Sequence, residues 1–124
     1  MSASTRTNSL KPGQYANNSP EIRYYNDDNL NDMENKKTRL IAVSYVSYLN
    51  SPQVNLSHYP QLASLVRAIL IVDFTQAAGY APIDASVADS AFLACYKWLL
   101  GTTAAAITYW NQTRMPDSSP ATGG

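Results

Sequence analysis

Cys95 and His58 are the first candidates for chemistry, because a thiol and an imidazole can act together as nucleophile and base. Each residue type occurs once in the chain. No flanking motif marks either position, and a lone cysteine is more often a buried core residue than a nucleophile. We therefore interpret Cys95 as a core residue and His58 as a loop residue, and predict no catalytic residue in either.

Metal and cofactor sites are not predicted either. One cysteine and one histidine cannot supply the three or four ligands of a zinc site. The acidic run Asp27-Asp28-Asn29 with Asp32 offers oxygen ligands. It lacks the glycine and the closing glutamate of an EF-hand loop, which favours a solvated turn. The patterns GxGxxG, GxxxxGK and HExxH do not occur, so neither a nucleotide cofactor nor a metalloprotease site is expected.

Asp73 differs in polarity from its neighbours. On a helical wheel it falls inside an apolar arc, and a buried carboxylate must be paired, hydrogen-bonded or protonated. It would serve either as a catalytic acid or base, or as a polar anchor. We favour the anchor, because structural ion pairs also perturb carboxylates. Its expected partner is Arg39, Lys97, a tyrosine hydroxyl or another subunit.

The elements that position these residues are predicted to be mainly helices. Residues 36–49 fit a helix or a strand, since their β-branched and aromatic residues suit both. Two later apolar segments, about 60–78 and 84–112, are too long for ordinary strands. Gly79 is expected as a left-handed cap and Asp84 as an N-cap. The prediction is an all-α fold, a small bundle of about three helices.

Composition divides the 124-residue chain into three parts. Residues 1–35 are rich in Ser, Asn and Asp, which predicts an extended polar arm that cannot form a core. Residues 36–114 form the helical body, and residues 115–124 form a short polar tail. The N-terminus has no apolar run typical of a secretory signal peptide.

The charge of the chain is low and balanced. Charged residues make up 15% of the sequence, and nine basic residues match nine acidic ones. Direct binding of nucleic acid is not expected, because it requires a positive surface. A small monomer normally presents a charged surface. The low charge therefore favours a protein whose surface is largely covered by partner subunits.

Candidate contact residues follow from the helix faces and from the nine tyrosines, a residue type enriched at interfaces. The predicted helix 60–78 is apolar over more of its circumference than one neighbour would cover. Small residues in the last segment let another helix approach, within the chain or from a second subunit. The interface candidates are Tyr24, Tyr25, Leu65, Val72, Asp73, Phe74, Gly101 and Ala105.

These features predict a non-enzymatic structural subunit of a large assembly that contacts itself or other structural subunits. A virion protein (capsid, cement or connector), assembled in the cytoplasm, is the favoured setting. The alternative is an accessory subunit of a membrane complex with a helix 92–110 against lipid, although Lys97 is costly there. An enzyme that uses Asp73 or Cys95 ranks third, because no site constellation supports it.

Overall fold

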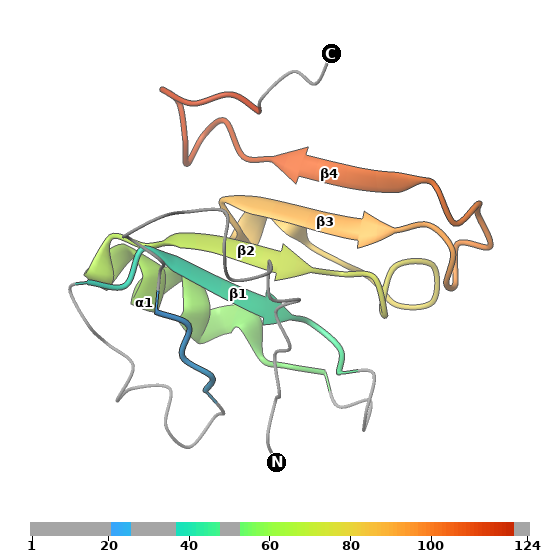
Figure 1. Ribbon diagram of the computed structural model, residues 1–124, viewed down its shortest axis with the longest axis horizontal. Helices are drawn as coiled ribbons and strands as arrows, with labels where there is room; N and C mark the ends of the chain where they lie inside the picture. Colours follow the sequence, from blue (N-terminus) through green and yellow to red (C-terminus); the bar gives the residue numbers. More distant parts are fainter. Residues whose placement is uncertain (1–20, 26–36, 48–52, 121–124) are drawn as a thin grey trace.

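The chain folds as a four-stranded mixed sheet with one α-helix against it (Figure 1), so the prediction of an all-α bundle is wrong. A computed structural model describes residues 21–25, 37–47 and 53–120. The elements are β1 (Leu40–Ser44), α1 (Tyr59–Val66), β2 (Ile69–Asp73), β3 (Ser90–Ala94) and β4 (Ala106–Trp110), with short 3-10 helices η2 (Leu56–His58) and η3 (Ala85–Val87).

The strands lie in the order β1-β2-β3-β4. The first three are parallel, and β4 runs antiparallel to β3. One row of the register joins Val43, Val72, Ala91 and Tyr109 across all four strands. Parallel neighbours need a crossover connection, and α1 supplies it between β1 and β2. Figure 1 shows α1 beneath the sheet, on the side of β1 and β2.

The core lies between the sheet and α1. Alternate residues of a strand point to opposite faces, and one face of the three parallel strands is buried against Tyr59, Leu62 and Ala63 of α1. The buried strand residues on this face are Ile41, Val43, Leu70, Val72, Ala91 and Leu93.

The predicted helix 60–78 ends early. Pro60 lies in the first turn of α1, as a proline suits, but Arg67 takes a left-handed conformation (φ 57°) that ends the helix after Val66. The chain then forms β2, which pairs with strands on both sides. Leu70 and Val72 of β2 are buried on the core face, whereas Ile71 on the other face is half-buried and Ile69 is exposed. The apolar run of this segment therefore reflects a central strand rather than a helix covered by other subunits.

The predicted helix 84–112 is also replaced by strands. Asp84 is an N-cap as expected, but of the three-residue η3, where its side chain accepts the amide of Ser86. The segment beyond forms β3, a turn and β4. The proposed helix 92–110 against lipid is therefore wrong. No helix among the described residues is long and apolar enough to cross a membrane.

Two further sequence expectations are settled by this fold. The open choice for residues 36–49 resolves to a strand, since β1 lies within them. Gly79 has the expected positive φ of 103°, but it lies in the turn region after β2 and not at a helix end.

Short described parts of the arm and the tail contact the body. The Tyr25 hydroxyl donates to the carbonyl of Ala42 at 3.0 Å, and its ring lies 6.2 Å from that of Tyr59. At the other end, Trp110 Nε1 donates to the carbonyl of Ser118 at 3.2 Å. The rest of the arm, including Asp27 to Asp32, lies outside the described residues.

Candidate functional site

The connection between β3 and β4 carries a cluster of exposed aromatic and aliphatic side chains. Leu100 is 90% exposed and Trp98 is 59% exposed. Soluble proteins rarely gather large apolar side chains at one place on the surface without a contact to make there. We call this cluster the turn patch; it consists of Tyr96, Trp98, Leu99 and Leu100 of this connection, together with Tyr80, which contacts Trp98 from the connection between β2 and β3.

Backbone hydrogen bonds hold the turn patch in place. The amide of Leu100 donates to the carbonyl of Lys97 at 3.0 Å, and the amide of Gly101 donates to the carbonyl of Cys95 at 2.8 Å. A Cβ atom added to Gly101 would lie 2.8 Å from Cys95 Cβ, closer than real side chains approach. Gly101 is therefore required for the chain to turn back toward β4.

Leu100 adopts a left-handed conformation, with φ of 54°. This conformation costs a non-glycine residue about 1–2 kcal/mol. The side chain regains little of that cost through packing, because it is almost fully exposed. Strained residues of this kind cluster at functional sites, so Leu100 marks the tip of the turn patch as the strongest candidate contact.

The connection between β2 and β3 supports the turn patch from a second side. The rings of Tyr80 and Trp98 meet edge to face, with centroids 5.4 Å apart. Gly79 lies against the backbone of Trp98, where an added Cβ would be 2.8 Å from the Trp98 carbonyl carbon. The patch is therefore assembled from two connections that the sheet brings together.

Charge is sparse around the turn patch. Lys97 is the only charged residue between Asp89 and Arg114, and its ammonium lies 5.1 Å from the centre of the Tyr96 ring. A cation at this distance from an aromatic ring is attracted to the ring face. The patch thus presents an apolar surface bordered by a single positive charge.

A separate hollow lies at the carboxyl ends of β1 and β2, where α/β proteins commonly bind ligands. It has a volume of 530 Å³ and is lined by Tyr45, Val54, Phe74, Ile83 and Asp84, among others. Of the described residues that line it, Asp84 alone carries a carboxylate. The hydroxyl of Ser86 at 2.6 Å and the amide of Ser86 at 2.9 Å lower the pKa of Asp84. A lone cap carboxylate, ionised and bound to its own helix, does not form a general acid–base pair.

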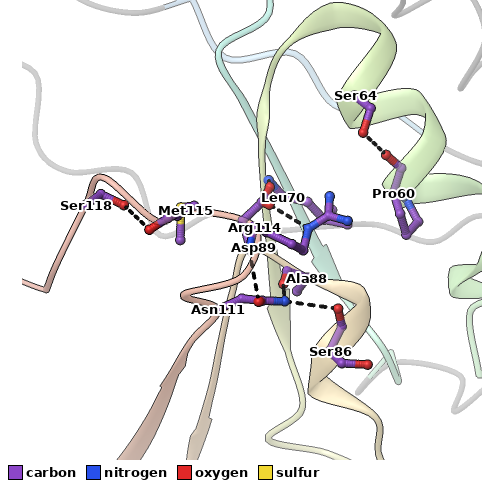
Figure 2. A network of polar contacts seen from close by, with 10 residues as sticks. All are labelled: Pro60, Ser64, Leu70, Ser86, Ala88, Asp89, Asn111, Arg114, Met115 and Ser118. Carbon is purple, nitrogen blue, oxygen red and sulfur yellow. Dashed lines mark hydrogen bonds and ion pairs between the residues drawn. The ribbon is translucent and has the colours of Figure 1, made fainter.

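A third polar feature joins the end of β4 to the start of β2 and β3, as Figure 2 shows. Asp89 is buried; its Oδ2 accepts the amide of Leu70 at 2.7 Å, and its Oδ1 accepts Nε of Arg114 at 2.7 Å. Asn111 Nδ2 donates to the carbonyls of Ser86 at 3.1 Å and Ala88 at 2.9 Å. We call these residues (Asp89, Asn111 and Arg114) the clamp. The bonds of the clamp tie the segment after β4 to β2 and to the segment before β3.

Residues once considered for chemistry are placed apart from one another. Cys95 is a half-buried free thiol after β3, and His58 is exposed at the N-cap of α1. Asp73 is half-buried at the end of β2, where its Oδ1 accepts the amide of Thr75 at 2.8 Å. Its anchor is thus a turn amide, not one of the charged partners expected. The described residues hold no group of three or more metal-binding side chains.

The interface candidates lie in three different environments. Val72 and Phe74 are buried in the core of the chain, which corrects their assignment as contact residues. Tyr24 and Leu65 are exposed, and Tyr25 packs on the core from the edge of β1. Gly101 and Ala105 both lie in the turn between β3 and β4, where the Ala105 carbonyl accepts the amide of Cys95. They shape this turn rather than a helix seam.

Sequence reasoning missed most of the turn patch and all of the clamp. The signal for the patch was the run Tyr96-Lys97-Trp98-Leu99-Leu100-Gly101, in which four large apolar residues and a lysine end at a glycine. When this run is interpreted as a helix, its large apolar residues point to several different faces of that helix, so they do not form one patch. Comparisons with protein-family models and with curated proteins found no match to this chain.

Proposed function

We propose that this protein is a non-enzymatic structural subunit of a large assembly and that the turn patch is a contact surface between its copies. The observation that carries the proposal is Leu100, which is 90% exposed in a left-handed conformation. A glycine would fit this backbone at lower cost. A leucine there is costly for the isolated chain, and the burial of its side chain in a partner would compensate for that cost.

The residue composition of the turn patch suits a protein partner. Trp and Tyr are enriched among the residues that contribute most to protein–protein binding, and three of the five patch residues are Trp or Tyr. Full burial of one leucine or aromatic side chain contributes about 1.5–3 kcal/mol. Trp98 and Leu100 together would therefore supply much of the free energy of a stable contact.

A repetitive shell such as a virion is the setting we propose for this subunit. The low net charge and the polar arm of residues 1–35 support that setting. The arm would extend across neighbouring copies, in addition to the contact made by the turn patch.

Sedimentation velocity of the full chain tests the contact. We expect the wild-type chain to form species larger than a dimer, and the double variant Trp98→Ser/Leu100→Ser to lose them. Leu40→Ser is the matched control, since Leu40 is 52% exposed on β1 and lies outside both the patch and the predicted interface candidates. Circular dichroism should show that all three proteins keep their secondary structure.

Three results would count against the proposal. The wild-type chain could form nothing larger than a dimer at any concentration, or the double variant could assemble as the wild type does. Patch-dependent binding to vesicles of phosphatidylcholine and phosphatidylserine, without patch-dependent assembly, would instead identify a lipid contact and refute the protein contact.

The variant Leu100→Gly separates the contact from the fold. It should raise the free energy of unfolding by about 0.5–1 kcal/mol, because glycine relieves the left-handed conformation. It should at the same time weaken assembly, because the exposed leucine is gone. A variant that is more stable and assembles fully would show that Leu100 makes no contact.

A further inference from the structure

Among the described residues, no strand pairs with the outer edge of β4. The amide of Asn111 donates to the Asp89 carbonyl at 3.0 Å, and the amide of Cys95 donates to the Ala105 carbonyl at 3.0 Å. These bonds flank β4 and fix its odd-numbered residues as those bonded to β3. Bonded and non-bonded residues alternate in an antiparallel pair, so the backbone groups of Ala106 and Thr108 point away from β3. No hydrogen bond from another described residue reaches them.

The opposite edge of the sheet is protected, and the β4 edge is not. On β1, the Tyr25 hydroxyl donates a hydrogen bond to the carbonyl of Ala42. The charged residues Lys37 and Arg39 lie just before the strand in the sequence. Proteins usually protect edge strands with charges, prolines or covering segments. From residue 102 to residue 113 the chain has no charged residue, no proline and no glycine. The β4 edge is therefore open to pairing with another strand.

Two side chains of β4 are not buried by α1. Ile107 is 55% exposed and Tyr109 is 39% exposed. The register places Ile107 opposite Leu93 and Tyr109 opposite Ala91, on the face of the sheet that carries the core. A further strand beside β4 would continue this face and cover both side chains.

We propose that β4 pairs antiparallel with β4 of a second copy, which joins two four-stranded sheets into one sheet of eight strands. The strand is uncharged, so two copies face each other without repulsion between like charges. Its sequence Ala-Ile-Thr-Tyr-Trp is rich in the β-branched and aromatic residues that favour strands. A two-fold axis makes the same groups of each copy serve as donor and acceptor.

The axis lies at Ile107. Trp110 Nε1 donates to the Ser118 carbonyl at 3.2 Å. The chain after β4 folds back beside the end of this strand (Figure 1). Pairing centred on Ile107 leaves that end free. Ala106 of each copy then faces Thr108 of the other, with about four backbone hydrogen bonds in total. The two Ile107 side chains form a non-hydrogen-bonded pair, in which side chains come closest.

This dimer does not depend on the turn patch. A symmetric contact of this kind closes after two copies. A second contact through the turn patch would link such dimers into the larger species proposed above. The two contacts are therefore separable by mutation.

Disulfide trapping tests the axis directly. In a Cys95→Ala background, Ile107→Cys should give a disulfide-linked dimer on mild oxidation of the full chain. Leu40→Cys is the control, because Leu40 is 52% exposed, close to the 55% of Ile107, but lies on β1 at the opposite edge of the sheet. A dimer yield for Ile107→Cys no greater than that for Leu40→Cys would overturn the proposed axis.

Two edge variants test the pairing itself. Thr108→Pro removes an outward N–H and leaves the bonds to β3 intact, and Ile107→Lys places two positive charges opposite each other at the axis. Each should raise the dimer dissociation constant at least tenfold in sedimentation equilibrium, with an unchanged circular-dichroism spectrum. If Thr108→Pro does not fold, the result for Ile107→Lys alone tests the pairing. This variant should fold, because Ile107 is half-exposed in the single chain.

The outcomes of the two proposals are distinguishable. Trp98→Ser/Leu100→Ser should leave the β4 dimer intact, while the edge variants should leave the patch contact intact. A wild-type chain that stays monomeric at millimolar concentration, or a dimer unchanged in Ile107→Lys, would overturn the β4 pairing. A chain that stays monomeric would also refute the turn-patch contact, whereas a dimer unchanged in Ile107→Lys would overturn the β4 pairing alone.

Discussion

Replacement of Asp89 by alanine should destabilise the fold more than any other loss of a single polar side chain among the described residues. Asp89 serves two donors at once, the amide of Leu70 in β2 and the guanidinium of Arg114 after β4, each at 2.7 Å. In Asp89→Ala the Leu70 amide stays buried without an acceptor. Burial of an unsatisfied donor costs about 1–3 kcal/mol, and a hydrogen bond to a charged group contributes about 1.5–3 kcal/mol.

The expected loss is smaller than the sum of these two values, because the Arg114 side chain is 28% exposed and regains water. We expect the free energy of unfolding to fall by about 2–4 kcal/mol in Asp89→Ala. Arg114→Ala removes only the ion pair and leaves the Leu70 bond in place. That variant should lose about 1–2 kcal/mol. The difference between the two variants measures the Leu70 bond.

Urea unfolding followed by circular dichroism is the assay. With an m value of about 1–2 kcal/mol/M, Asp89→Ala should lower the midpoint by about 1–4 M. Asp84→Ala is the matched control, since it removes a carboxylate that is exposed and caps only η3. Its midpoint should stay close to that of the wild type. Equal and small shifts in Asp89→Ala and Asp84→Ala would refute the assignment of the clamp as the bond between the end of β4 and the core.

Three further predictions follow from single positions. Gly79→Ala should lower the free energy of unfolding by about 1–3 kcal/mol, because of the positive φ and the added Cβ 2.8 Å from Trp98; a thermal midpoint unchanged in calorimetry would contradict this. Val72→Ala should cost about 1–3 kcal/mol in urea unfolding, because Val72 is fully buried; a neutral result would mean that β2 is not a core strand. Asp84 should titrate below its usual pKa of 3.8, since hydrogen bonds from Ser86 favour the ionised form. The ionised carboxylate therefore stabilises η3 at pH values above 3.8, and this stabilisation is lost as the pH falls through the lowered pKa of Asp84. In Ser86→Ala, the pKa of Asp84 measured by NMR titration should rise back toward 3.8. An unchanged pKa would contradict the role of the Ser86 hydroxyl.

The sequence by itself determined the local features of the chain. Asp84 as an N-cap, Pro60 in the first turn of α1 and the positive φ of Gly79 each depend on one residue and its immediate neighbours. Such preferences act within a few residues, so they can be recognised without the fold. Pro60 does begin a helix as predicted, whereas the elements served by the other two were assigned wrongly, because Asp84 caps a single 3-10 turn and Gly79 lies in the turn after β2.

The tertiary structure decided whether the apolar segments became helices or strands. The run Ile69-Leu70-Ile71-Val72 is apolar at four consecutive positions, a pattern that fits either a helix or a central strand. Only its position between β1 and β3 selects the strand, because the hydrogen bonds of β2 are made with residues distant in the sequence. A short apolar run does not contain that information.

The candidate surfaces also depended on tertiary structure. Tyr80 meets Trp98 only because the sheet brings two connections together, and Asp89 meets Arg114 across 25 residues of sequence. The open edge of β4 exists because β4 is the last strand of the sheet. The uncharged composition of residues 102–113 could be read from the sequence, but its exposure along a strand edge was fixed by the order in which the strands pair.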